Sequence, residues 1–357
     1  MPCFGILYIL YFLNNHFFLR IFASIKFFLT MRIAINGMGR IGRLLFRRLM
    51  ENEQFEVVAV NDIMPIENLA YLLKYDSVYG TYLSKIKSDG QSLLINNKKI
   101  AALQNEDPEK LPWKDLNVDV VLECSGKFID KAGASKHLTA GAKKVLLSTT
   151  GAEDVSLLVY GYNQNGSIAN LDILSPGGCM TNCSTHVLYI LNSIGINSVH
   201  INILHSYTSR QALVDMPHSQ FRRGRAAAES IIPVAIDLHK SLNRLLPDLK
   251  DKINVFSTRV PVSNGAMASF TIQLKNNVTT AGVNNLFETA AQNQYKGILD
   301  YTEEPLVSLD IKGNSNSCII DATQTSVIGN HARVVAWFDN EYGFTSRMID
   351  WLNYWKK

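Results

Sequence analysis

The sequence has 357 residues, of which 47% are apolar and 18% are charged, and its formal net charge is +4. This length exceeds what one core usually organises, so we expect two domains in a protein of ordinary globular composition. The mild charge and the lack of a long basic run exclude nucleic acid as a predicted partner, although local basic patches can still attract small anions.

Five cysteines are spread along the chain at positions 3, 124, 179, 183 and 318. An odd number at such wide spacing does not resemble a disulfide framework, and no pair of CxxC motifs indicates zinc. We therefore predict a protein without a metal site in a reducing compartment.

Residues 1–30 are dense in Phe, Ile, Leu and Tyr and carry only two charged side chains. The apolar run at residues 3–13 is interrupted by a polar tripeptide, so it falls short of the roughly 18 residues that span a bilayer. A basic segment and a cleavage site typical of a secretory signal are not clear either. We interpret residues 1–30 as an extension outside the fold, with a membrane anchor as the alternative, and expect no stable membrane association.

A strand pattern at residues 32–36 is followed by Gly37-Met38-Gly39-Arg40-Ile41-Gly42 and by an amphipathic helix pattern at residues 43–50. The next strand pattern, residues 56–60, leads to Asp62, about 20 residues past the last glycine as the dinucleotide fingerprint requires. The glycines permit a tight turn and the close approach of a pyrophosphate to the helix N-terminus. The Asp62 carboxylate can bind ribose hydroxyls and repel a 2′-phosphate, which predicts NAD rather than NADP. The alternative is a tight turn that binds nothing.

Further strand patterns at residues 118–124 and 144–148, with a helix pattern at 131–140 between them, predict a doubly wound sheet. Beyond Cys179 the pattern changes to longer strands and grouped helices, which favours an antiparallel or mixed sheet. The predicted fold class is α/β, with a Rossmann NAD-binding domain followed by an α+β catalytic domain. These later elements are expected at residues 226–246 (helix) and at 259–261, 268–274 and 332–338 (strands).

Cys179 follows a Ser-Pro-Gly-Gly turn and precedes a helix pattern at residues 185–194, so it is expected at or just before a helix N-terminus. Exposed backbone N–H groups and the helix dipole favour the thiolate there. His205, in a strand pattern at residues 201–208, is a candidate base for this thiol. Taken alone, the same pattern fits a buried and inert cysteine, which is the commoner fate of this residue type.

Seven motifs follow one another at residues 35–43, 69–77, 179–183, 205–208, 222–228, 259–262 and 337–344. Together, from Met31 to the C-terminus, they resemble the glyceraldehyde-3-phosphate dehydrogenase family. The resemblance implies NAD-dependent oxidation of a small phosphorylated aldehyde through a cysteine thiohemiacetal and thioester. The reaction that the resemblance favours is the oxidation of glyceraldehyde-3-phosphate to 1,3-bisphosphoglycerate in glycolysis or gluconeogenesis. The enzyme is expected to be a cytoplasmic homotetramer. The expected boundaries are 31–178 for the NAD-binding domain and 179–342 for the catalytic domain, with a helix at 343–357 packing back on the first.

The resemblance also implies individual roles. Cys179 matches the nucleophile and His205 the base that activates it. Three residues match groups that bind the phosphate of the substrate or the phosphate that attacks the thioester, a role suited to a hydroxyl and to guanidinium groups: Thr208, Arg223 and Arg259. The residues that match the cofactor site are Asn36, Gly37, Gly39, Arg40, Ile41, Gly42, Asp62, Ser148 and Asn340, the last of which orients the nicotinamide carboxamide. The loop with Met216 and Pro217 resembles that of NAD-preferring members and is expected to reach a neighbouring subunit's cofactor site.

Several positions depart from the family pattern. Gly178 and Met180 replace hydroxyl residues beside the nucleophile, and Ile236 and Asp237 stand where the family has Thr-Gly. The site for inorganic phosphate has thereby lost hydroxyl donors and gained a carboxylate that should repel the anion, whereas Arg210 replaces an acidic residue and adds positive charge.

Two alternative functions remain. Erythrose-4-phosphate dehydrogenases share the scaffold but use water to resolve the thioester, and this sequence resembles that subgroup at residues 230–234, 300–308 and 321–325. An inactive NAD-binding homologue is the other alternative, against which the joint retention of Cys179, His205 and Asn340 argues.

Removal of residues 1–30 is expected to leave a fully active enzyme, because the first strand of the fingerprint begins only after them. Activity and membrane fractionation of the shortened and full-length chains measure this. If the shortened chain loses activity, or only the full-length chain sediments with membranes, the extension is an anchor.

Overall fold

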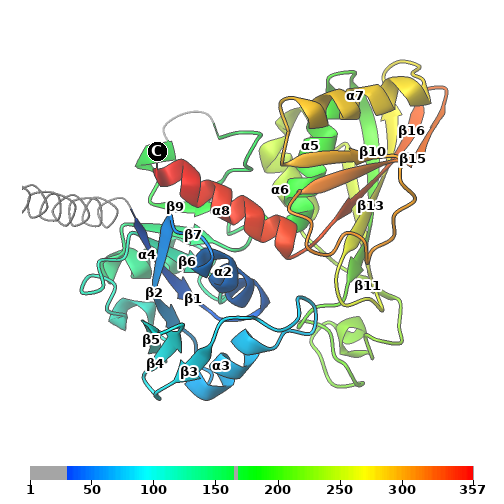
Figure 1. The fold of residues 1–357 in the computed structure, drawn as a ribbon. Coiled ribbons are helices and arrows are strands. Elements are labelled where there is room, and N and C mark those ends of the chain that lie inside the picture. The colour runs from blue at the N-terminus through cyan, green and yellow to red at the C-terminus, as the bar shows by residue number, and fades with distance from the viewer. Residues whose placement is uncertain (1–29, 165–167, 357) are drawn as a thin grey trace, which may run out of the picture.

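The computed structural model describes residues 30–164 and 168–356, so the predicted extension lies outside the described residues except for Thr30. Two sheets lie beside each other, one built from the first half of the chain and the other from the second (Figure 1). Among the described residues, no helix has the length and apolar character needed to cross a bilayer.

The first sheet has nine strands in the order β3-β4-β5-β2-β1-β6-β7-β9-β8. Its central strand β1 is parallel to β2 and β6, so the strand order reverses direction beside β1, as in dinucleotide-binding sheets. An antiparallel edge is formed by β3, β4 and β5. The strands are β1 (Met31–Asn36), β2 (Phe55–Asn61), β3 (Ile86–Ser88), β4 (Ser92–Ile95), β5 (Lys98–Leu103), β6 (Val120–Glu123), β7 (Lys144–Leu147), β8 (Ser156–Leu157) and β9 (Ile173–Ser175).

Helices α2 (Arg40–Met50), α3 (Ile66–Lys74) and α4 (Lys131–Thr139) pack against this sheet. The central strands are buried on both faces, which explains why β1 and β2 read as almost continuous apolar runs. The predicted α/β class and its Rossmann sheet are therefore confirmed, with the antiparallel edge added.

The second sheet has seven strands in the order β11-β12-β10-β13-β16-β15-β14. It is mixed, because β10 is parallel to β12 and β14 to β15, whereas the other pairs are antiparallel. The predicted α+β arrangement on a mixed sheet is thus confirmed. The strands are β10 (Ile196–Ser206), β11 (Ile232–Val234), β12 (Ile253–Val260), β13 (Ala266–Leu274), β14 (Leu299–Thr302), β15 (Cys318–Ile328) and β16 (His331–Phe338).

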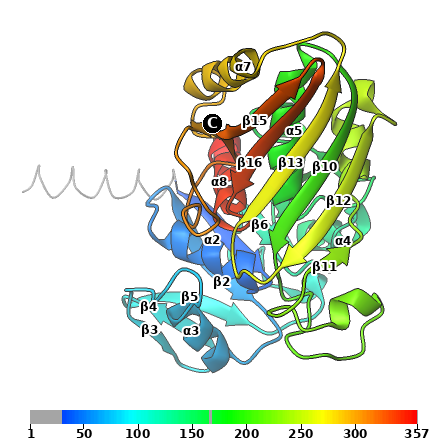
Figure 2. The same cartoon turned by 90° about the vertical axis from the view of Figure 1, so that its right-hand side faces the viewer.

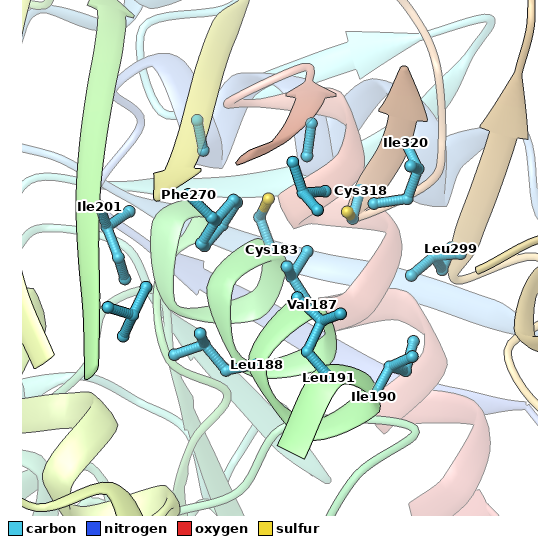
Figure 3. Packing of buried hydrophobic residues seen from close by; sticks show 14 of the residues in the cluster. Cys183, Val187, Leu188, Ile190, Leu191, Ile201, Phe270, Leu299, Cys318 and Ile320 are labelled. Atoms are coloured by element: carbon cyan, nitrogen blue, oxygen red, sulfur yellow. The ribbon is translucent and has the colours of Figure 1, made fainter. Parts of the chain in front are cut away.

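Helices α5 (Cys179–Asn192), α6 (Leu238–Leu245) and α7 (Thr280–Gln292) share one apolar core with this sheet (Figure 2). Buried and exposed residues alternate along the middle of β10, so only one face of the strand is covered within the chain. Helix α5 contributes Cys183, Val187 and Leu191, which lie toward Phe270 and Ile320 of the sheet (Figure 3).

The predicted helix at residues 226–246 is wrong over its first half. That segment contains strand β11, which pairs with β12, and the helix α6 begins only at Leu238. Pro233 removes a backbone donor from any helix there, and the flanking Ile232 and Val234 are β-branched. The expectation that Cys179 lies at or just before a helix N-terminus is confirmed, because α5 starts at Cys179 itself, ahead of the apolar pattern that begins at residue 185.

The last helix, α8 (Tyr342–Lys356), returns to the first sheet and lies between the two halves of the molecule (Figure 1). Its buried side chains Met348, Trp351 and Leu352 belong to the same core as Leu45 of α2. Arg48 of α2 also donates from Nη1 to the carbonyl oxygen of Tyr342 at 3.0 Å. The predicted domain boundaries stay predictions; they agree with sheets drawn from residues 31–175 and 196–338.

Candidate active site

Cys179 is the first residue of α5, directly after a turn that ends β9. Gly177 has a φ of +78°, a left-handed conformation that glycine adopts without strain. The side chain of Asn182 donates from Nδ2 to the carbonyl oxygens of Pro176 and Gly178, both at 2.9 Å, which holds the turn. No side chain caps this helix N-terminus, so its first N–H groups remain directed toward the Cys179 side of the turn.

His205 lies near the end of β10, and its Nε2 is 3.8 Å from Sγ of Cys179. Its Nδ1 is 2.7 Å from the carbonyl oxygen of Ser206, which can only accept, so Nδ1 carries the hydrogen. The lone pair of Nε2 therefore faces the thiol. This is the geometry of a general base beside its nucleophile.

Burial dominates the protonation states of this pair. It raises the pKa of the Cys179 thiol to about 12, with Arg259 acting in the opposite direction. It lowers the pKa of His205 to about 3, and the neighbouring Arg259 lowers it further. Without ligands, the site thus holds a neutral thiol and a neutral imidazole that is ready to accept a proton.

Arg259 lies beside His205 because the two residues are register partners on the parallel strands β10 and β12. Its side chain is buried at 6% exposure, and Nε and Nη1 have no hydrogen-bond partner. Arg223, from the short 3₁₀ helix η3 (Phe221–Gly224), is 8% exposed and has an unpartnered Nη1. Within the described residues no carboxylate forms an ion pair with either guanidinium group. Two buried cations without a counter-ion form a site for an anion.

Thr208 lies two residues past the end of β10. Its hydroxyl donates to Oε1 of Gln211 at 3.0 Å, and its backbone N–H donates to the same oxygen at 2.9 Å. The hydroxyl oxygen in turn accepts the N–H of Arg210 at 3.3 Å, so these bonds fix the side chain in one orientation. Gln211 was not predicted from the sequence, although it follows the motif at residues 205–208.

The replaced positions beside this site are apolar or turned away. Met180 and Ile236 pack against the core of the second sheet, so neither offers a hydrogen-bond donor to an anion. Asp237 is 77% exposed and pairs with Lys240 at 3.0 Å. The repulsion that its carboxylate was expected to exert on an anion is therefore weakened by a paired cation and by solvent.

The glycine-rich turn lies where β1 meets α2. Gly37 has a φ of +93°, and a Cβ there would fall 2.4 Å from the backbone nitrogen of Ser125. A Cβ at Gly42 would fall 2.1 Å from the carbonyl oxygen of Gly37, so the first and last glycines are required by the turn itself. A Cβ at Gly39 meets nothing within 4 Å, and no side chain caps α2 there. Open space in front of uncapped N–H groups, including those of the first turn with Ile41, fits a pyrophosphate.

Asp62, directly after β2, accepts the N–H of Met38 at 2.6 Å and that of Met64 at 3.0 Å. These bonds hold the carboxylate beside the glycine-rich turn, where the sequence places it. The neighbouring Ile63 is 58% exposed and has no donor for a phosphate.

Asn36 and Arg40 are engaged by protein groups through their side chains. Asn36 donates from Nδ2 to the buried Glu123 at 2.5 Å and accepts from Nδ2 of Asn61 at 2.7 Å. Arg40 forms a bidentate pair with Glu341, at 2.9 and 2.6 Å, and a second pair with Asp76 at 2.6 Å. These pairs use three of the five guanidinium N–H groups, and the backbone of Arg40 lies at the start of α2, where the predicted cofactor role needs it. Glu123 carried no signal in the sequence beyond its place at a strand end.

Ser148 follows the C-terminal end of β7 in the first sheet, and Asn340 lies two residues past the end of β16 in the second. Oδ1 of Asn340 accepts from the Ser206 hydroxyl at 3.1 Å and from the Gly265 N–H at 3.0 Å, which fixes the orientation of the amide. Ser206, next to His205, was not predicted but belongs to the same motif. Ser148 follows β7, and its N–H donates to the carbonyl oxygen of Glu123 at 2.9 Å.

Two family models match the chain. Residues 31–131 match the NAD binding domain of glyceraldehyde 3-phosphate dehydrogenase, and residues 178–340 match its C-terminal domain. The chain belongs to the glyceraldehyde-3-phosphate dehydrogenase family. It is 42% identical over 329 residues to a protein of that name from Priestia megaterium, covering 91% of this chain and 98% of that protein.

Other members give the same picture. Glyceraldehyde-3-phosphate dehydrogenase 1 from Bacillus subtilis is 42% identical over 325 residues, covering 90% of this chain and 97% of that protein. The Geobacillus stearothermophilus protein is 41% identical over 325 residues, with the same two coverages. The predicted family, the NAD cofactor and the class of NAD-dependent oxidoreductase are confirmed, and the open, uncapped turn at Gly39 fits that cofactor.

This family member is expected to use NAD over NADP by at least about tenfold in kcat/KM. Like charges at about 4 Å repel by about 4 kcal/mol at an effective dielectric of 20, and even half of this exceeds tenfold. Asp62→Asn should lower the ratio of kcat/KM with NAD to kcat/KM with NADP. Glu67→Gln, which removes another carboxylate nearby in sequence, should leave this ratio unchanged. Steady-state kinetics with both cofactors measure this, and equal use of both by the unaltered enzyme would disprove the ribose contact.

Alkylation of Cys179 in the cofactor-free protein is expected to accelerate about tenfold per pH unit between pH 6 and 9. The thiol pKa of about 12 lies above this window, so the thiolate fraction rises throughout it. The His205 pKa of about 3 lies below it, so the imidazole stays neutral and His205→Asn should retain the same slope. Iodoacetamide labelling followed by peptide mass spectrometry measures the rate. A plateau that disappears in His205→Asn would instead indicate a preformed thiolate–imidazolium pair.

Proposed function

We propose that this protein oxidises glyceraldehyde-3-phosphate to 1,3-bisphosphoglycerate with NAD, in glycolysis or gluconeogenesis. One observation carries the proposal: a thiol 3.8 Å from a neutral imidazole, beside two buried guanidinium groups without a counter-ion. The first pair suits attack on a carbonyl, and the second suits a phosphorylated substrate. The names of its relatives agree with this substrate.

In the proposed reaction, Sγ of Cys179 attacks the aldehyde carbon while Nε2 of His205 accepts the thiol proton. His205 then returns the proton to the carbonyl oxygen, which gives a thiohemiacetal on Cys179. NAD, when bound, would supply the hydride acceptor for oxidation of the substrate carbon. Nε2 of His205 takes the hydroxyl proton at that stage, so the product on Cys179 is a thioester. Attack of a phosphate oxygen on the thioester carbon breaks the bond to Sγ and forms the acyl phosphate, and the proton on His205 Nε2 returns to the leaving Sγ.

Binding and positioning fall to groups around this pair. Thr208, Arg223 and Arg259 are proposed to bind the phosphate of the aldehyde or the attacking phosphate. Arg259 Nε and Nη1 and Arg223 Nη1 have no acceptor among the described residues, which leaves them to donate to an anion. Asn340, held through Oδ1 by Ser206 and Gly265, is proposed to orient the nicotinamide carboxamide.

A second candidate is oxidation of erythrose-4-phosphate with water resolving the thioester. It is favoured by Ile236, which packs against the core at the place where the family has a hydroxyl donor. The two reactions differ in one requirement, since only the first consumes inorganic phosphate.

We also propose a cytoplasmic homotetramer in which the loop around Pro217 reaches a neighbouring subunit. Large apolar side chains on this loop are exposed in the single chain, including Phe221 at 89% and Val214 at 75%, which supports burial by another copy. The nucleophilic thiol of Cys179 supports a reducing location.

Cys179→Ser is expected to abolish NADH formation while NAD binding persists, because a serine hydroxyl gives up its proton to the imidazole far less readily than a thiol and its oxygen is a much weaker nucleophile than sulfur. Cys183→Ser, one helical turn away in the buried core, is the matched control and should act mildly. The assay supplies glyceraldehyde-3-phosphate or erythrose-4-phosphate, each with and without phosphate. Phosphate-dependent turnover of the triose supports the main proposal, and phosphate-independent turnover of the tetrose supports the second. Full activity of Cys179→Ser would remove Cys179 from the mechanism.

A further inference from the structure

The anion site beside Cys179 is surrounded by more positive charge than Arg223 and Arg259 alone supply. Arg210, on the loop after β10, lies close enough to act electrostatically on both, and like-charge repulsion from it lowers their pKa values in addition to the larger effect of burial. Among the described residues no carboxylate pairs with Arg210. The nearest acidic residues of this region are engaged elsewhere, Asp215 with Arg225 and Asp237 with Lys240.

The loop that carries Arg210 is fastened to the site. The N–H of Arg210 donates to the Thr208 hydroxyl oxygen at 3.3 Å, and the N–H of Gln211 donates to the Thr208 carbonyl oxygen at 3.0 Å. One residue further, the Ala212 N–H donates to the carbonyl oxygen of Arg223 at 2.9 Å. The turn at residues 208–211 is thereby held against the backbone of Arg223, and Arg210 projects from it as an exposed side chain.

Unsatisfied donors mark the same place. Nη1 of Arg223, Nε and Nη1 of Arg259, and Nε2 of Gln211 are buried and have no partner among the described residues. Leaving a buried donor unpaired is unfavourable, and more so for a charged group, so several such donors in one region indicate a ligand that accepts from them. Three guanidinium groups without a carboxylate specify an anion, and a phosphoryl dianion offers the charge and the acceptor oxygens.

We propose that Arg210 is a specificity-determining residue of this site. Together with Arg223 and Arg259, it binds a phosphoryl dianion. Arg210 supplies by charge part of the affinity that a hydroxyl donor at position 236 would give, since the Ile236 side chain has no donor and packs against the core. The inference rests on the proposed function for its substrate. The phosphoryl group can belong to the aldehyde or to free inorganic phosphate, and both present the same chemistry.

The test compares Arg210→Gln with Arg222→Gln, which removes the same charge from an exposed arginine adjacent to Arg223. In Arg210→Gln, kcat/KM for glyceraldehyde-3-phosphate should fall about tenfold, as expected for loss of a solvent-screened charge near a dianion. The value for unphosphorylated glyceraldehyde should stay within about twofold of the wild type. Arg210→Lys should retain most of the preference for the phosphorylated over the unphosphorylated aldehyde, and Arg222→Gln should retain all of this preference.

Two titrations separate the sources of the phosphoryl group. A rise confined to the KM for the aldehyde assigns Arg210 to the substrate phosphate, and a rise confined to the KM for inorganic phosphate assigns it to the attacking anion. The inference would be overturned if Arg210→Gln changed neither the ratio of kcat/KM for phosphorylated over unphosphorylated glyceraldehyde nor the KM for inorganic phosphate. An equal loss of kcat/KM for glyceraldehyde-3-phosphate in Arg222→Gln would also overturn it.

A binding measurement keeps this inference distinct from the proposed function. Inorganic phosphate should raise the Tm of the wild type more than that of Arg210→Gln, whether or not either aldehyde is oxidised. If the wild type oxidises neither phosphorylated aldehyde but shows this difference, the proposed function fails and the role of Arg210 stands. If phosphate stabilises both proteins equally, the role of Arg210 fails.

Discussion

The packing of α5 across the second sheet is the constraint on which the site depends. Cys183, Val187 and Leu191 fix the helix in the core (Figure 3). Its first residue, Cys179, thereby lies beside His205 near the end of β10. The parallel register of β10 and β12 then brings Arg259 beside His205. Nucleophile, base and cation thus come from three elements that share one core, and a shift of α5 would change the 3.8 Å separation of Sγ and Nε2.

The same core sets the electrostatics. Burial raises the pKa of the Cys179 thiol and lowers the pKa of the His205 imidazole, so both groups are neutral. They therefore form no thiolate–imidazolium pair beside the guanidinium groups. A neutral imidazole whose Nδ1 is bound to a backbone oxygen can accept a proton only at Nε2, the atom that faces the thiol. The remaining positive charge belongs to Arg223 and Arg259, and among the described residues no carboxylate pairs with either of them. This charge is suited to attracting a phosphorylated substrate.

The two halves of the molecule are joined at the motif around Asn340. Its neighbour Glu341 forms a bidentate pair with Arg40, and Asp339 accepts from the Tyr79 hydroxyl at 2.9 Å and from Asn264 at 3.1 Å. Both Arg40 and Tyr79 belong to the NAD-binding half. These bonds hold Asn340 in place between the two sheets, and they give the Arg40 side chain a structural role in joining the two halves.

The sequence by itself determined the features that local backbone chemistry decides. The turn at Gly37, the uncapped start of α2 and the position of Cys179 after a glycine turn follow from residues within one or two turns of chain, so their spacing predicted the cofactor and marked Cys179 as a candidate nucleophile. Strand order, by contrast, depends on pairings between distant segments, and the helix expected at residues 226–246 failed because β12 pairs with Ile232 and Val234. Only the tertiary structure decided that Arg40 would pair with a carboxylate 301 residues away, and that buried donors of Arg223 and Arg259 would find no partner in the part of the chain that the structure describes. Ion pairs and buried donors are set by which side chains the completed core brings together, and a linear pattern does not contain that information.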